Sequence, residues 1–336
     1  MEEKESYTAM PLVSATFIPG HCLEAVQTMK NVRERQIAMA EYYYFIGQPE
    51  KAAQETEPLL VSPYIELRLS ACLVYAYANL ATGHLDRSIH ALNEIQSTAE
   101  AMDENVSPQL RATASWLSRT AAVLLHLPPK DSTSYNMKDL NLLTPGLRAF
   151  VCYVQAHYAY LKEDYGMSLG IIETALAFQQ ETYPIPGIYL HLAATMDYMS
   201  LKRTEEAREH MQEAWKLAWP DGLLQPFGEH HGLLGGMVEA TFKKDWPEEY
   251  KKIIAITYSF SEGWRKIHNP RAGSDVTDKL TTTEFAVAML AARGWTNQEI
   301  CDHMDISLHT VKYHISSILR KLDITKRSEL KRYMLQ

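Results

Sequence analysis

Apolar residues recur at helical spacing along most of the chain. The windows 33–45, 64–80 and 147–161 place them every three or four positions, which is the period of one face of an α-helix. Between about residues 21 and 260 there are no alternating strand-like runs and no hairpin turn pairs. Breakers such as Ser62-Pro63 and Pro145-Gly146 separate the windows. The pattern predicts an all-α protein made of consecutive helices.

The breakers return at a regular distance. The block that starts at Gly47 lines up with one that starts at Gly83, 36 residues later, and the same register meets Glu163 after 80 residues and Lys202 after another 39. The long gap fits two periods, with a degraded unit over 107–143. Periods of this length in helical sequence predict a helical-hairpin repeat solenoid. The arrangement resembles tetratricopeptide repeats, whose usual Trp, Gly and Tyr positions are partly kept.

Each block also has a small residue where the two helices of a pair would approach closely: Ala52, Ser88, Ser168 and Ala207. The register is lost after Pro220, and 268–275 has no periodic apolar pattern. We therefore expect four segments: an irregular lead-in over 1–20, a tetratricopeptide-like repeat domain over 21–264, a linker over 265–279, and a small helical domain over 280–336.

Two consecutive helix-start signals open the terminal segment. Thr281 with Glu284, and Thr296 with Glu299, have the spacing of capping boxes, in which each side chain satisfies a free backbone N–H of the other residue. A short turn follows the second helix, and Ser307 can then cap a longer helix that ends near residue 322. Two helices joined by so short a turn predict a helix-turn-helix, whose second helix enters the major groove of DNA.

The helical wheel of that longer helix assigns its faces. Val311, Ile315, Ile318 and Leu322 fall within about 40° of one another and predict a buried stripe. The outward face, with Ser317 at its flank, predicts base reading by Lys312, Tyr313, Ser316 and His309. We expect contacts to the DNA backbone from Thr296, Ser307, Thr310, Arg320, Lys321, Lys326 and Arg327.

The charge distribution supports a DNA contact confined to one end. The chain carries a net charge of −8, whereas residues 308–336 hold seven Lys or Arg and two acids, a local charge of +5 that leaves −13 for the rest. A positive field at one end of an acidic chain suits local DNA binding. A merely solvated polar helix face is the simpler alternative interpretation.

The motif string of this segment is more specific than its charge. It reads Leu280-Thr281-x-x-Glu284, then Gly294-x-Thr296-Asn297-x-Glu299-Ile300, then Ile306-Ser307-x-x-Thr310-Val311-Lys312-x-His314. Over about 55 residues it closely resembles the DNA-binding domain of the LuxR family, although Thr283 stands where Arg is common and Cys301 where Ala is usual. The resemblance implies double-stranded DNA as partner, a homodimer on DNA, and a dimer-forming last helix over about 326–335. Its apolar contacts would be Leu330, Tyr333 and Met334.

Helical repeats before a LuxR-type domain resemble the C-terminal part of the MalT-like regulators, which normally begin with an ATPase module. This sequence contains no GxxxxGK[ST] loop and no β/α receiver pattern. The remaining role for the repeats is to bind a small inducer or a protein partner. A tyrosine-rich set is interpreted first as repeat core and second as a ligand site: Tyr42, Tyr43, Tyr44, Tyr75, Tyr77, Tyr153, Tyr158 and Tyr160.

Other chemistries have weak support. The four cysteines are widely spaced without a CxxC pair, no signal peptide opens the sequence, and no apolar run approaches the roughly 20 residues of a membrane helix. His230-His231 and Cys301-x-His303 offer too few ligands for a metal, and no nucleophile elbow occurs. We expect a cytoplasmic protein that has no cofactor or metal, does not bind membranes and is not an enzyme.

Two hypotheses follow. The first is a sequence-specific transcription regulator controlled by a small ligand or a protein partner at the repeat domain. The second is a helical-repeat scaffold or adaptor whose tail serves assembly or weak DNA tethering. Salt dependence separates them, because phosphate contacts make affinity fall steeply with salt.

Overall fold

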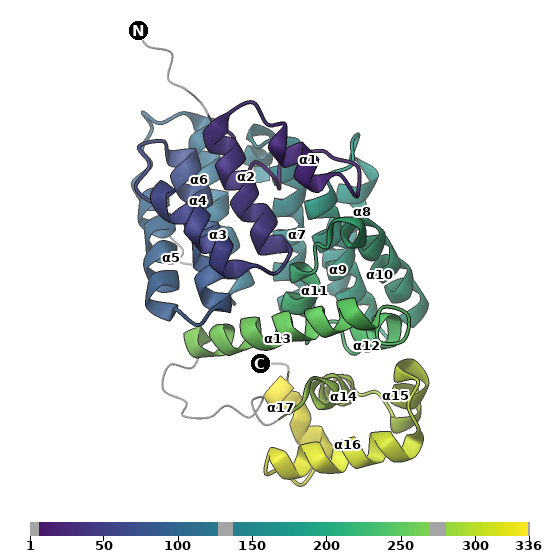
Figure 1. The fold of residues 1–336 in the computed structure, drawn as a ribbon. Coiled ribbons are helices and arrows are strands. Elements are labelled where there is room, and N and C mark those ends of the chain that lie inside the picture. Colours follow the sequence, from purple (N-terminus) through teal and green to yellow (C-terminus); the bar gives the residue numbers. More distant parts are fainter. Residues whose placement is uncertain (1–6, 127–136, 269–279, 335–336) are drawn as a thin grey trace.

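The structure is a computed structural model that describes residues 7–126, 137–268 and 280–334 (Figure 1). Across these ranges the regular structure is entirely helical, as predicted, with seventeen α-helices and a few short 3₁₀ turns. The first twelve helices are α1 (Cys22–Gln27), α2 (Val32–Phe45), α3 (Pro49–Thr56), α4 (Ile65–Ala81), α5 (Leu85–Glu100), α6 (Pro108–Leu124), α7 (Pro145–Leu161), α8 (Tyr165–Ala177), α9 (Pro184–Ser200), α10 (Thr204–Ala218), α11 (Gln225–His230) and α12 (Met237–Phe242).

Neighbouring helices pair as hairpins, and the turns between them share one conformation. The turns of α2–α3, α4–α5, α7–α8 and α9–α10 have Gly47, Gly83, Glu163 and Lys202 at φ of +74°, +77°, +59° and +59°. In each turn the next N–H donates to the carbonyl five residues earlier, at 2.8 to 3.0 Å. This is the left-handed helix ending that satisfies the last carbonyls. The four positions are those that the sequence register aligned.

A fifth left-handed residue lies inside the long gap of the register. His126 follows α6 and has φ of +52°, 43 residues after Gly83 and 37 before Glu163. The end of α6 therefore shares its backbone conformation with the four turns, although the sequence around it does not resemble the other blocks.

The small residues of the blocks lie where the paired helices touch. Ala52, Ser88, Ser168 and Ala207 are all at most 1% exposed. The Thr195 hydroxyl of α9 comes within 3.3 Å of the Ala207 carbonyl oxygen of α10. Because the partner helix covers each position, a side chain larger than Ala or Ser would force the pair apart.

The lead-in is irregular as expected over residues 7–20, but it is packed into the core. Leu12 and Val13 are at most 1% exposed. Their N–H groups donate to the two carboxylate oxygens of Glu41 on α2, at 2.9 and 3.2 Å. Burial raises the pKa of Glu41 to about 8, while these two hydrogen bonds act in the opposite direction.

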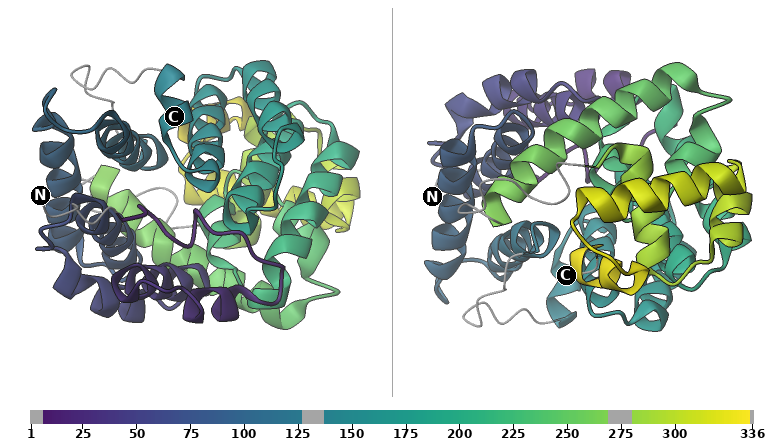
Figure 2. Two further views of the ribbon diagram at one scale, coloured as in Figure 1. Left: turned by 90° about the horizontal axis from the view of Figure 1, so that it is seen from above. Right: turned by 90° about the horizontal axis from the view of Figure 1, so that it is seen from below.

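The hairpins follow one another along a curve, and α13 (Pro247–His268) runs across their lower ends (Figures 1 and 2). It packs against α4 and α11. The crossing is close: a Cβ on Gly263 would lie 1.9 Å from the Leu80 carbonyl oxygen. Only glycine lets α13 approach α4 this closely.

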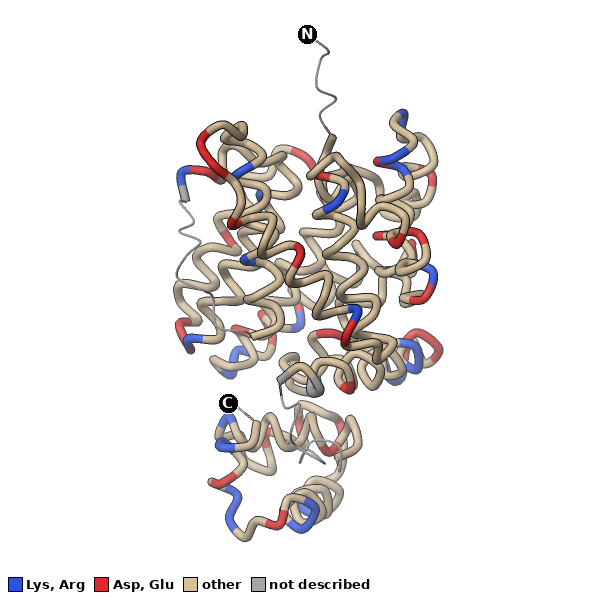
Figure 3. The backbone as a smooth tube through the Cα atoms, turned by 90° about the vertical axis from the view of Figure 1, so that its left-hand side faces the viewer, with Lys and Arg blue, Asp and Glu red and all other residues tan. Residues whose placement is uncertain are grey.

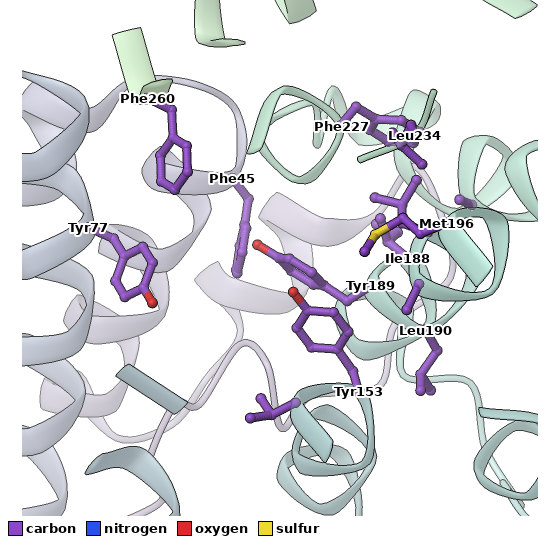
Figure 4. Packing of buried hydrophobic residues seen from close by; sticks show 14 of the residues in the cluster. Phe45, Tyr77, Tyr153, Ile188, Tyr189, Leu190, Met196, Phe227, Leu234 and Phe260 are labelled. Atoms are coloured by element: carbon purple, nitrogen blue, oxygen red, sulfur yellow. The ribbon is translucent and has the colours of Figure 1, made fainter. Parts of the chain in front are cut away.

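Tyrosines and phenylalanines fill the interior between the hairpins (Figure 4). The rings of Tyr153 and Tyr189 are 4.8 Å apart at their centroids. In the tyrosine set singled out by the sequence, Tyr44, Tyr75, Tyr77, Tyr153 and Tyr160 are buried, and Tyr42, Tyr43 and Tyr158 are half-buried. Most of the set is repeat core. Across the described helices, none has the length and apolar character needed to cross a membrane.

Candidate nucleic-acid interface

The terminal domain is built from α14 (Thr282–Ala292), α15 (Asn297–Met304), α16 (Leu308–Lys321), a 3₁₀ turn (Arg327–Glu329) and α17 (Leu330–Met334). Both capping boxes form. Glu284 accepts from the Thr281 N–H at 2.9 Å and donates its own N–H to the Thr281 hydroxyl at 3.2 Å, and Thr296 and Glu299 do the same. The local sequence therefore fixes where α14 and α15 begin.

The turn into α16 is equally local. Asp305 ends α15 in the left-handed conformation at φ +52°, and the Ile306 N–H returns to the Cys301 carbonyl oxygen at 3.3 Å. The Ser307 hydroxyl then accepts the Thr310 N–H at 3.0 Å and caps α16. These contacts give the helix-turn-helix predicted from the sequence.

α16 separates buried and outward residues as the wheel predicts. Val311, Ile315, Ile318 and Leu322 are at most 9% exposed. The four residues predicted to read bases are all exposed, namely His309, Lys312, Tyr313 and Ser316. α16 lies on the side of the domain that faces away from the repeat helices (Figure 1). The outward face is thus open to a partner of the size of a DNA duplex.

Two details of this face bear on its chemistry. The aromatic residue Tyr313 is 63% exposed. The Ser316 hydroxyl donates to the Lys312 carbonyl oxygen at 2.9 Å within the helix. Because that bond engages the hydroxyl hydrogen, the Ser316 oxygen is left as an acceptor for a base amino group.

The residues predicted to contact the DNA backbone divide into three groups. Arg320 and Lys326 are exposed, as are Lys331 and Arg332 of α17. The lower, terminal domain carries several Lys and Arg segments, drawn blue in Figure 3. Thr296, Ser307 and Thr310 have their polar groups engaged in the helix caps. Lys321 and Arg327 are turned into the domain, which the sequence did not predict.

Glu284 is the centre of this internal network. It is 5% exposed and accepts from the Lys321 ammonium at 2.6 Å and from the Ser317 hydroxyl at 2.8 Å. Burial would raise the pKa of Glu284, but the bonds from Lys321, the Thr281 N–H and Ser317 outweigh it and hold the pKa below its ordinary value. Ser317 is therefore a buried residue rather than the flank residue that the wheel suggested. The network fastens α14 to α16.

Arg327 also joins two segments of the terminal domain through its side chain. Its guanidinium donates to the Trp295 carbonyl oxygen and to the Asn297 side-chain oxygen. Burial lowers the pKa of Arg327 from its ordinary value. These bonds tie the segment before α17 to the start of α15.

The last helix differs from the expectation that it presents an apolar surface. Leu330 and Met334 are 0% and 8% exposed, because they pack into the core of their own domain against α14. Tyr333 is half-buried. The exposed residues of α17 are Lys331 and Arg332, so two of the three predicted dimer contacts are already covered within the protomer. The homodimer stays a prediction.

Two cations without a role expected from the sequence join the terminal domain to the repeats. Arg293 at the end of α14 donates to the Tyr160 hydroxyl and, at 2.9 Å, to the Leu233 carbonyl oxygen. Lys202 contacts Glu299 at 3.2 Å. Local periodicity cannot find such contacts, because the partners lie 60 to 133 residues apart.

Taken together, the caps, the short turn and the exposed basic helix define a helix-turn-helix DNA-binding domain. A profile described as bacterial regulatory proteins of the luxR family matches residues 278–334. A domain of this type implies DNA binding in transcription regulation. In the ranges that the structure describes, no group of three or more His, Cys, Asp or Glu residues is placed to hold a metal ion.

Curated relatives match a short part of the chain. The response regulator protein VraR of Staphylococcus aureus and that of Staphylococcus epidermidis are each 36% identical over 63 residues, which is 19% of this chain and 30% of theirs. The match thus spans less than a third of those relatives. No solved structure matches the chain.

Proposed function

We propose that the chain is a sequence-specific DNA-binding transcription regulator whose helical-repeat region binds a small ligand or a protein partner that controls it. The observation that carries the DNA part is the outward face of α16, where His309, Lys312, Tyr313 and Ser316 are exposed together on a helix-turn-helix. An exposed row of donors and one aromatic at the start of such a helix suits base edges in the major groove.

A half-buried acid in the repeat region supports the control function. Glu229 on α11 accepts from the hydroxyls of Tyr44 and Tyr189, the latter at 2.9 Å, and from Gln225 at 3.2 Å. Burial raises the pKa of Glu229 to about 7, against the effect of these bonds. The donors Tyr44, Tyr189 and Gln225 are neutral side chains among aromatic rings. An apolar aromatic setting with a few polar groups is typical of small-ligand sites.

Selection from random duplex DNA tests the proposal. The full-length protein, with competitor DNA at near-physiological salt, is expected to enrich one motif, and an inverted repeat would support binding as a homodimer. Enrichment of no motif, together with weak binding that is indifferent to sequence, would favour the scaffold or adaptor instead.

Lys312→Ala tests the assignment of the reading face. Loss of a base contact of this kind costs about 1–3 kcal/mol, so affinity for the selected site should fall about tenfold to a hundredfold. Lys216→Ala, which removes an exposed cation on α10, is the matched control and should bind like the parent protein. Unchanged affinity of the Lys312 variant would move base reading to other residues.

A further inference from the structure

The terminal domain sits on one short loop of the repeat region. Residues 231–236, between α11 and α12, contact α14 and α15 at successive positions. The Leu233 carbonyl oxygen accepts from Arg293 at 2.9 Å, and the Gly235 carbonyl oxygen accepts from the His303 ring at 3.1 Å. Burial lowers the pKa of His303, which keeps the ring neutral and able to donate to that carbonyl oxygen. The loop thus presents its own backbone acceptors to the DNA-binding domain.

Glycines make this approach possible. A Cβ at Gly232 would lie 2.6 Å from the Phe285 ring, and one at Gly235 would lie 2.9 Å from the Arg293 guanidinium. Gly235 also has φ of +59°. The loop is therefore shaped for the DNA-binding domain both by its backbone conformation and by the absence of side chains.

The charge of Arg293 also acts on a buried acid of the repeat region. Asp197 on α9 is 0% exposed. Burial raises the pKa of Asp197 to about 7, while the Ser168 hydroxyl and Arg293 of the other domain act in the opposite direction. Separating the domains would remove this favourable effect of Arg293 on the ionised form of Asp197.

A second ion pair lies at the edge of the contact. Lys202, in the turn between α9 and α10, approaches both carboxylate oxygens of Glu299 at 3.2 and 3.3 Å and donates to the Gly294 carbonyl oxygen at 3.1 Å. Both groups are partly exposed, so this pair contributes little energy but is accessible to reagents.

We propose that residues 231–236 and the α9–α10 turn form a docking surface for the DNA-binding domain of the same chain, with Arg293 as its latch. The latch holds the domain while α16 stays uncovered, so the repeat region controls where the reading helix points rather than whether it is exposed. Its regulatory meaning rests on the proposed function, but docking itself is measurable without DNA.

Carbodiimide cross-linking of the full-length protein tests the dock, because the reagent joins a Lys and an acid that are in direct contact. Mass spectrometry should find Lys202 joined to Glu299. Arg293→Ala should reduce that product at least about fivefold, as loss of charge-assisted hydrogen bonds predicts. The pair Lys216 and Glu213, within α10 at 2.6 Å, should cross-link equally in both proteins, and circular dichroism shows that the variant is folded.

Three results would overturn the proposal. One is absence of the Lys202–Glu299 product in the parent protein while Lys216 and Glu213 are joined, and another is a product that Arg293→Ala leaves unchanged. The third comes from cross-linking a mixture of ¹⁵N-labelled and unlabelled protein. If the Lys202 peptide of one is joined to the Glu299 peptide of the other, the docked domain belongs to a second copy of the chain.

DNA binding separates this inference from the proposed function. On a DNA site selected with the parent protein, Arg293→Ala should bind a single half-site within about twofold of the parent, because α16 is already exposed in the docked state. A gain of tenfold or more would show that docking hides the reading face and would refute the latch as described. Failure to select any site, with cross-linking intact, would remove the proposed function and leave the dock.

Discussion

The repeat region and the DNA-binding domain are both entirely helical where described, yet they are specified in different ways. In the DNA-binding domain, caps a few residues apart fix the starts of α14, α15 and α16, and a family profile matches almost the whole domain. In the repeat region, the recurring features are a left-handed turn and a small residue, while the side chains around them vary. Repeats therefore preserve backbone geometry when their sequence diverges, whereas the DNA-binding domain preserves named residues.

The largest expected effect concerns the small residues of the repeats. Ala207→Leu should destabilise the protein by about 3 kcal/mol or prevent folding, since the side chain has to enter a filled contact between α9 and α10. Ala177→Leu, at an exposed end of α8, is the control and should change stability by less than about 0.5 kcal/mol. Denaturant unfolding measures both, and equal stability of the two variants would mean that the small residues do not set the helix spacing.

The two regions should also respond oppositely to pH. In the repeat region the pKa of Glu41 is raised to about 8 and those of Glu229 and Asp197 to about 7, so the folded state binds extra protons. Their stabilisation is present at lower pH and is lost as pH rises through the folded pKa. Between pH 6.5 and 8 the repeat region should lose roughly 3 kcal/mol, about half of it through Glu41.

The stability of the DNA-binding domain changes with pH in the opposite direction. The pKa of Glu284 lies below its ordinary value, so its contribution is present above the unfolded pKa and is lost as pH falls through the folded pKa. Hydrogen exchange of peptides from α2 and α16 resolves the two regions. Protection of α2 should fall from pH 6.5 to 8, after correction for intrinsic exchange rates, and should fall by about half as much in Glu41→Gln, where Glu229 and Asp197 still titrate. An equal fall in that variant would exclude Glu41 as the cause.

The smallest effect tests the shared turn. Glu163 is in the left-handed conformation that glycine adopts at no steric cost, so Glu163→Gly should stabilise the protein by about 0.5 kcal/mol. Gly83→Ala should destabilise it by about 1 kcal/mol through backbone strain alone, because a Cβ there meets no atom within 4 Å. Thermal unfolding measures both variants, and shifts of the same sign would contradict the equivalence of the turns.

Features set by nearby residues were predictable from the sequence. The capping boxes and the stripe that starts at Val311 depend on residues within one to three helical turns, and the structure has them where expected. The left-handed turns at Gly47, Gly83, Glu163 and Lys202 also lie at the positions that the sequence aligned. The inward roles of Lys321 and Arg327 were not predictable, since a cation on a helix face looks the same whether it meets solvent or a buried carboxylate. Glu229 and Asp197 were missed because their partners lie on helices distant in sequence.

The bond between Glu41 and the lead-in has a practical consequence for anyone shortening the protein. Residues 7–20 look dispensable by secondary structure, yet they supply both N–H donors to a carboxylate that has no access to water. Removing them for expression or crystallisation would expose the apolar side of α2 and leave that carboxylate without a hydrogen-bond donor. If a shortened protein aggregates, the cause would be the missing segment. The aggregation would say nothing about the solubility of the repeats in the full-length protein.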